Sequence, residues 1–128
     1  MKEHILIVED DIAFLKMLTT FLERKGYNVT GVSTIKEAKD ALDSTTFPLV
    51  ITDLKLPDET GLALLEYAKQ ISPATRVIMM TGYAEVTSAV AAIKKGALDY
   101  ISKPFRPEEL LMIMPVSYTH LRAHETDS

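Results

Sequence analysis

The chain has 128 residues, the length of one ordinary domain, and it contains no cysteine, which excludes a disulfide scaffold, a thiolate metal site and a cysteine nucleophile. Its 14 Lys and Arg against 18 Asp and Glu give a formal net charge of −4, which does not favour nucleic-acid binding. Neither a signal peptide nor an apolar run of the roughly 18 residues needed to span a membrane is visible, so we expect a cytoplasmic globular domain.

Strand and helix patterns alternate from the N-terminus. Ile5–Val8 is apolar at four successive positions, which predicts a strand covered on both faces. Apolar residues then recur at helical spacing over positions 14–22. Asn28–Val32 mixes polar and apolar residues, as an edge strand does, and a capping-box pattern at Thr34–Glu37 predicts the start of a second helix.

The same alternation continues in the second half of the chain. Leu49–Ile51 and Val77–Met80 are further all-apolar strands, whereas Leu98–Ser102 is mixed. Helices are predicted between them and after them, the last over positions 106–114 with Pro107 in its first turn. The stripes predicted to face the core are Leu62, Leu65, Ala68 and Ile71 on the third helix, and Val86, Ala89, Val90 and Ile93 on the fourth.

Five strands alternating with five helices predict an α/β fold with a doubly wound parallel sheet of flavodoxin-like order 2-1-3-4-5 and the three apolar strands in its centre. The fifth helix stops early at Pro115, so we expect a domain over residues 1–114 with a truncated last helix, followed by a non-native or disordered tail over residues 115–128. His120 and His124 in that tail have the i, i+4 spacing of a helical metal pair but follow a helix breaker.

Polar residues gather where the predicted strands end: Glu9, Asp10, Asp11, Asp53, Thr81 and Lys103. In sheets of this type, ligands bind beyond the carboxyl ends of the strands. Crowded carboxylates repel one another, and Mg²⁺ relieves this repulsion with oxygen ligands. Asp10 and Asp53 are the best candidates for direct ligands, with Glu9 acting through water, whereas Asp11 also fits the N-cap of the first helix.

The chain resembles the receiver domain of bacterial two-component response regulators. The matching segments are Ile5–Asp11, Val50–Pro57 with Gly61, Met80–Tyr83 and Gly96–Phe105. Their order and spacing agree with the family over residues 3 to 114. The segments around Thr81 and Asp99 look most like receivers that regulate sigma-54-dependent transcription.

The resemblance implies a CheY-like signalling switch rather than an enzyme. Asp53 would accept a phosphoryl group, and Asp10, Asp53 and the backbone carbonyl of Lys55 would bind Mg²⁺, with Mn²⁺ as a second candidate. Thr81 and Tyr100 would be the switch residues. Lys103 would neutralise phosphoryl charge, and the bond between Lys103 and Pro104 would be cis.

The resemblance also implies partners. These are a sensor histidine kinase or phosphotransfer protein, an output domain that controls transcription, and a second copy of the chain meeting the face of the fourth helix, fifth strand and fifth helix.

The residues Glu85, Lys94 and Lys95 of the fourth helix are expected to face solvent.

Three other functions fit the sequence less well. An FMN site is disfavoured because the acidic loop of residues 9–11 would repel a phosphate. A Mg²⁺-dependent phosphohydrolase with an Asp nucleophile usually has a second acid where Lys55 stands. An unphosphorylated interaction module would not need the complete set of strand-end residues.

Overall fold

The computed structural model describes residues 3–82 and 85–115. The predicted tail, apart from Pro115, and its two histidines lie outside these residues. Five strands and five helices alternate: β1 (His4–Val8), α1 (Ile12–Arg24), β2 (Asn28–Val32), α2 (Ile35–Ser44), β3 (Leu49–Asp53), α3 (Gly61–Ile71), β4 (Arg76–Thr81), α4 (Val86–Lys94), β5 (Asp99–Ser102) and α5 (Pro107–Ile113).

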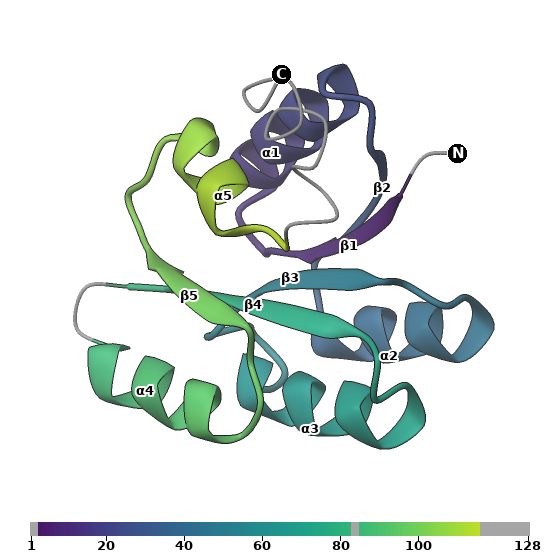
Figure 1. Ribbon diagram of the computed structural model, residues 1–128, viewed down its shortest axis with the longest axis vertical. Helices are drawn as coiled ribbons and strands as arrows, with labels where there is room; N and C mark the ends of the chain where they lie inside the picture. Colours follow the sequence, from purple (N-terminus) through teal and green to yellow (C-terminus); the bar gives the residue numbers. More distant parts are fainter. Residues whose placement is uncertain (1–2, 83–84, 116–128) are drawn as a thin grey trace, which may run out of the picture.

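The strands form one parallel sheet in the order β2-β1-β3-β4-β5, which confirms the predicted fold and its topology. The apolar strands β1, β3 and β4 are central, and β2 and β5 form the edges. Helices α1 and α5 cover one face of the sheet, and α2, α3 and α4 cover the other (Figure 1). None of the helices in the described part of the chain is long and apolar enough to cross a membrane.

The two faces of the sheet explain the unbroken apolar runs. Successive side chains of a strand point to opposite faces. In β1, Ile5 and Ile7 therefore pack in the cluster that includes Leu18 and Leu110, on the side of α1 and α5. Leu6 and Val8 pack in the opposite cluster with residues of α2 and α3. Both faces of the strand are covered, so every position must be apolar.

The predicted stripes of α3 and α4 were partly wrong. Ile71 is exposed and Leu64 is buried in its place. On α4, Ala89 and Ala92 are buried, whereas Val90 and Ile93 are 43% and 39% exposed. Helix α4 lies over the β5 edge of the sheet, and among the described residues no further strand extends beneath it for its outer apolar residues to pack on.

Candidate functional site

The sheet topology brings the predicted site residues to one edge. Asp53 and Thr81 are the last residues of β3 and β4, Glu9 and Asp10 follow β1 directly, and Lys103 follows β5. Parallel strands end on the same side of a sheet, so these residues come together although they are far apart in sequence.

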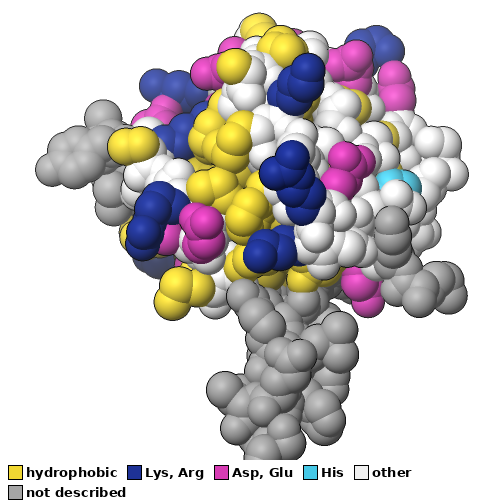
Figure 2. Space-filling model, turned by 90° about the horizontal axis from the view of Figure 1, so that it is seen from above, with side chains coloured by type: hydrophobic (Ala, Val, Ile, Leu, Met, Phe, Trp, Pro, Cys, Tyr) yellow, Lys and Arg dark blue, Asp and Glu magenta, His cyan; other side chains and the backbone are white. Residues whose placement is uncertain are grey.

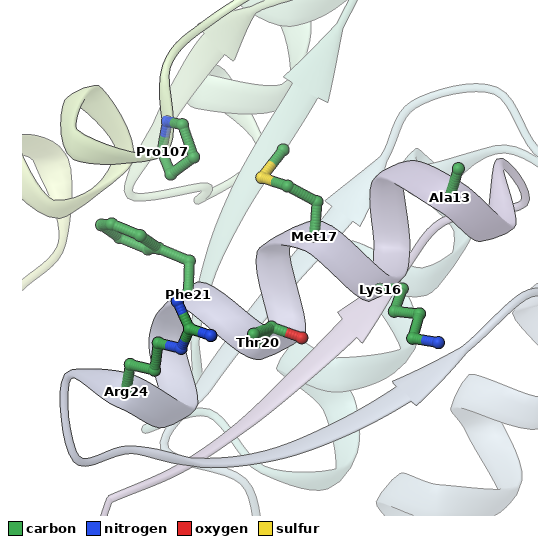
Figure 3. Close-up of a pocket in the computed structure, with 7 residues that line it drawn as sticks. All are labelled: Ala13, Lys16, Met17, Thr20, Phe21, Arg24 and Pro107. Carbon is green, nitrogen blue, oxygen red and sulfur yellow. The ribbon is translucent and has the colours of Figure 1, made fainter.

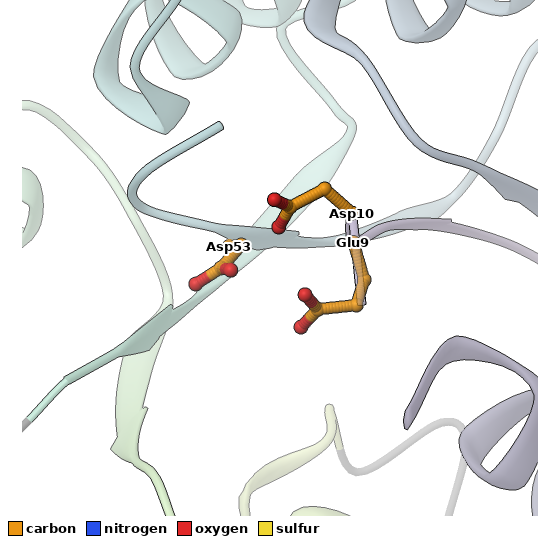
Figure 4. A group of neighbouring side chains, drawn as sticks. All are labelled: Glu9, Asp10 and Asp53. Atoms are coloured by element: carbon orange, nitrogen blue, oxygen red, sulfur yellow. The ribbon is translucent and has the colours of Figure 1, made fainter. Parts of the chain in front are cut away.

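Three carboxylates converge at this edge. One carboxylate oxygen each of Glu9, Asp10 and Asp53 lies within 4.8 Å of the other two, and Figure 4 shows the three groups directed into the same space. Glu9 and Asp53 are buried, and Asp10 is exposed. Such a set of oxygen donors, open to water on one side, fits the coordination that Mg²⁺ prefers.

Asp11 has a different role from its acidic neighbours. Its carboxylate accepts the N–H of Phe14 at 3.2 Å and caps the N-terminus of α1. The sequence had left both roles open for this residue. In the structure it is a helix cap, and it does not belong to the carboxylate cluster.

Lys103 provides the positive charge of the site. Its Nζ donates to Glu9 at 2.5 Å and to Asp53 at 3.2 Å. The peptide bond between Lys103 and Pro104 is cis, as predicted. The ammonium group also lies 4.9 Å from the ring centroid of Phe14 on α1, a cation–π contact that the sequence did not reveal because it depends on how α1 packs beside this turn.

The charges at this edge are not balanced. Burial, and then the negative charge of Glu9, raise the pKa of Asp53 to about 6, although Lys103 opposes the shift. Burial disfavours the charged form of Lys103, but its hydrogen bond to Glu9 and the charge of Asp53 outweigh this and raise its pKa. Lys103 thus pairs with two of the three carboxylates, and a divalent cation would neutralise the remaining negative charge.

Thr81 leaves a polar group unsatisfied beside Asp53. Its side chain is fully buried, and Oγ1 is the only buried side-chain oxygen or nitrogen without a hydrogen-bond partner within residues 3–82 and 85–115. Its backbone carbonyl accepts the N–H of Lys103 at 2.7 Å, which ties β4 to the turn after β5. A buried hydroxyl without a partner is unfavourable and indicates a missing acceptor.

The family model of the response regulator receiver domain matches residues 5–114. The chain belongs to this family. The receiver domain is 36% identical over 124 residues to the transcriptional regulatory protein ZraR of Escherichia coli O157:H7, a match that covers 95% of this chain and 28% of ZraR. The chain thus spans little more than a quarter of this curated relative.

Solved structures agree with this assignment. A CheY-like response regulator receiver domain protein from Methanospirillum hungatei superposes with a TM-score of 0.87 and 35% identity, covering 97% of this chain and 99% of the other. A response regulator protein from Burkholderia pseudomallei, solved with a phosphorylated aspartic acid, a calcium ion and citrate, superposes with a TM-score of 0.83 and 31% identity, covering 97% of this chain and 73% of the other.

The side chain of Glu85 is less exposed than predicted. We expected a solvent-facing residue, but its side chain is only 15% exposed, because Oε1 accepts the N–H of Gly82 at 2.7 Å. Oε2 lies 3.0 Å from Nζ of Lys55, whose side chain is 78% exposed. Lys94 and Lys95 are exposed as predicted, and Lys95 pairs with Glu66 at the surface.

The role of Tyr100 as a switch residue and that of the Lys55 carbonyl as a Mg²⁺ ligand remain predictions. Tyr100 is half-buried on β5 and packs against the core cluster under α2, α3 and α4. Lys55 forms an isolated antiparallel bridge with Thr60, which shapes the turn after β3.

A groove of about 580 Å³ lies along α1 on the opposite side of the sheet from α4. Ala13, Met17, Phe21 and Pro107 form its apolar part, with Lys16 and Arg24 at its margins (Figure 3). Figure 2, which faces this side, shows a band of hydrophobic side chains flanked by Lys and Arg. Helical periodicity alone did not reveal the groove, because it needs α5 beside α1.

Proposed function

We propose that this receiver domain is a phospho-acceptor switch of a two-component phosphorelay, with Asp53 as the acceptor. The observation that carries the proposal is the buried, unpartnered hydroxyl of Thr81 next to the strand that ends in Asp53. A phosphoryl oxygen on Asp53 is an acceptor of the kind this hydroxyl lacks.

The transfer would proceed as follows. A carboxylate oxygen of Asp53 attacks the phosphorus of a phosphohistidine whose other ring nitrogen carries a proton, the phosphorus–nitrogen bond breaks, and the histidine leaves as a neutral imidazole. Lys103 already donates to Asp53 and would neutralise charge on the transferred group. Asp10, Asp53 and the Lys55 carbonyl would hold Mg²⁺, or Mn²⁺, with Glu9 acting through water. The metal would supply further neutralisation of the phosphoryl oxygens.

The phosphoryl group adds about two negative charges at Asp53 and would draw Thr81 and Lys103 toward it. We expect Tyr100 to respond by turning inward and the face of α4, β5 and α5 to change its packing. Exposed apolar Val90 and Ile93 on α4 give this face the character of a contact surface.

The wider assignments are proposals too. We infer an output domain that controls transcription, in the sigma-54-dependent class, and a second copy of the chain as a partner for the α4–β5–α5 face. We keep residues 1–114 as the receiver and residues 115–128 as a tail that is not part of it. A cytoplasmic location also remains a prediction.

The partner that delivers the phosphoryl group would approach over α1. This helix starts two residues after Asp10, so its first turn borders the site, and Ile12 there is exposed. The groove along α1 suits a helix with an apolar stripe, and Lys16 and Arg24 suit acidic residues at its edges. A sensor histidine kinase or a phosphotransfer protein would supply such a helix.

Intact-mass spectrometry tests the proposal. The protein, incubated with Mg²⁺ and a small phosphodonor such as phosphoramidate, should gain one adduct of about 80 Da, the mass of a phosphoryl group. Asp53→Asn should abolish the adduct. Asp11→Asn is a matched control, because it removes a neighbouring charge and keeps a side chain that caps α1 well.

Other outcomes would favour the phosphohydrolase or the interaction module. Release of phosphate over many turnovers without an adduct would indicate a phosphohydrolase. Absence of both the adduct and phosphate release, with Mg²⁺ bound, would indicate an interaction module that is not phosphorylated.

A further inference from the structure

Glu85 joins the two segments that leave the site. Its carboxylate accepts the N–H of Gly82, the residue after Thr81, and pairs with Nζ of Lys55, two residues after Asp53. A single carboxylate therefore holds one donor from the end of β4 and one from the end of β3.

These contacts lie at the edge where Asp53 stands. Asp53 is paired with Met80 in the sheet, and the N–H of Leu54 donates to the carbonyl of Met80 at 2.8 Å. Lys55 and Gly82 follow the ends of these two strands, and the carboxylate of Glu85 joins them through its two oxygens. The hydrogen bond from Gly82 lowers the pKa of Glu85, with smaller contributions from Lys55 and Lys103, so Glu85 is ionised at neutral pH.

The packing around Gly82 supports the same picture. A Cβ atom at this glycine would lie 3.0 Å from Oε1 of Glu85, so the carboxylate sits directly against the backbone there. Glu85 is the N-cap residue of α4, yet its side chain makes no capping bond to the helix. Its carboxylate is directed back toward the site, where an anion is already expected to arrive.

We propose that the carboxylate of Glu85 competes with the phosphoryl group for the same two donors. It binds the Gly82 N–H and the Lys55 ammonium until a phosphoryl group on Asp53 binds them instead. This inference rests on the proposed function of Asp53. The Lys55 side of the ion pair is largely exposed and therefore weak, so a doubly charged group displaces it readily. Because Val86 begins α4, release of Glu85 acts directly on the first turn of that helix.

The proposal makes Glu85 a positioning residue that slows phosphorylation. Glu85→Gln keeps the acceptor for the Gly82 N–H but removes the charge that retains Lys55 and repels the phosphodonor. Adduct formation with phosphoramidate and Mg²⁺ should become roughly three- to tenfold faster, the scale expected for one nearby charge at a partly exposed site. In a Lys55→Met background the same substitution should give a smaller acceleration, because the two residues are coupled.

Glu66→Gln is the matched control. It makes the same change in net charge and also breaks a 3.0 Å ion pair with a lysine, but this pair is exposed between α3 and the end of α4. A rise in rate equal to that of Glu85→Gln would attribute the effect to net charge and overturn the proposal. Thermal denaturation shows whether each variant folds. Glu85→Asp, which is one methylene too short to hold both partners, serves if the Gln variant does not fold, and it should also be faster than wild type.

The outcomes separate this inference from the proposed function. If the adduct forms on Glu85→Gln at the wild-type rate or more slowly, the role of Glu85 is refuted. Asp53 remains the acceptor in that case. An adduct that never forms on the wild-type chain overturns both.

Discussion

Replacing Asp53 by Asn should make the receiver domain more stable when no metal is present. Burial and the charge of Glu9 raise the pKa of Asp53 from its ordinary value of 3.8 to about 6, so the ionised carboxylate is held in an unfavourable place. The neutral amide has nearly the same shape and removes this charge. Lys103 keeps its stronger contact, the one to Glu9.

The pKa shift sets the size and sign of the effect. A shift of about 2 pKa units corresponds to an upper limit of about 3 kcal/mol, and water at the open edge of the site reduces it, so we expect about 1–3 kcal/mol. Because the folded-state pKa of Asp53 is raised, the folded protein binds the proton more tightly than the unfolded chain. Stability is therefore lost as the pH rises from about 4 to about 6, and the full penalty persists above that range.

Urea denaturation in the presence of a chelator measures this difference. Asp53→Asn should unfold at a higher urea concentration than wild type at pH 7.5, and the two should converge near pH 4. Added Mg²⁺ should stabilise wild type more than the variant, because binding to the folded state raises its stability. Asp11→Asn should show no comparable gain at either pH. A variant no more stable than wild type at pH 7.5, or a gap unchanged at pH 4, would refute the reasoning.

Four further substitutions test the site and the elements around it. Asp10→Asn should weaken Mg²⁺ binding by at least about tenfold in titration calorimetry, since it removes a charged ligand. Thr81→Val should stabilise the unphosphorylated protein against urea by about 1 kcal/mol, because it removes a buried hydroxyl without a partner. Gly61→Ala should destabilise it by more than about 2 kcal/mol, because the new Cβ would lie 2.4 Å from the carbonyl oxygen of Asp53. Asp58→Ala should lower the urea midpoint at pH 7, and by progressively less as the pH falls below about 4, because backbone N–H groups at the start of α2 lower the pKa of Asp58 and the stabilisation is lost as that carboxylate is protonated in the folded protein.

The sequence allowed the fold, and the meeting of the strand-end residues at one edge, to be predicted for a simple physical reason. A strand such as Ile5–Val8 must be apolar at every position when both faces are covered, and polar residues can begin only where the strand leaves the core. The change from Val8 to Glu9 therefore marks the carboxyl edge of β1. Parallel topology then brings Asp53 and Lys103 to the same edge, which explains why residues so distant in sequence could be grouped correctly.

The contacts that could not be predicted depend on packing between elements. Helical periodicity places Glu85 near the start of α4, but it does not show that the backbone turns the side chain back to Gly82. Phe14 looked like a core residue of α1, and its contact with Lys103 depends on how α1 packs beside the turn after β5. Val90 was assigned to the core because periodicity cannot show where the sheet ends.

The unfavourable features of the resting site share one explanation. Asp53 is buried with a raised pKa beside Glu9, and Thr81 has a buried hydroxyl that finds no acceptor in the described structure. A site selected for stability alone would hold a neutral residue at position 53 and an apolar one at position 81. A bound divalent cation would supply the missing positive charge, and a phosphoryl group on Asp53 would supply the missing acceptor. Each of these unfavourable features would be relieved by one component of the proposed phosphorylated state, and a charge added at Asp53 could in this way shift the domain between two packings.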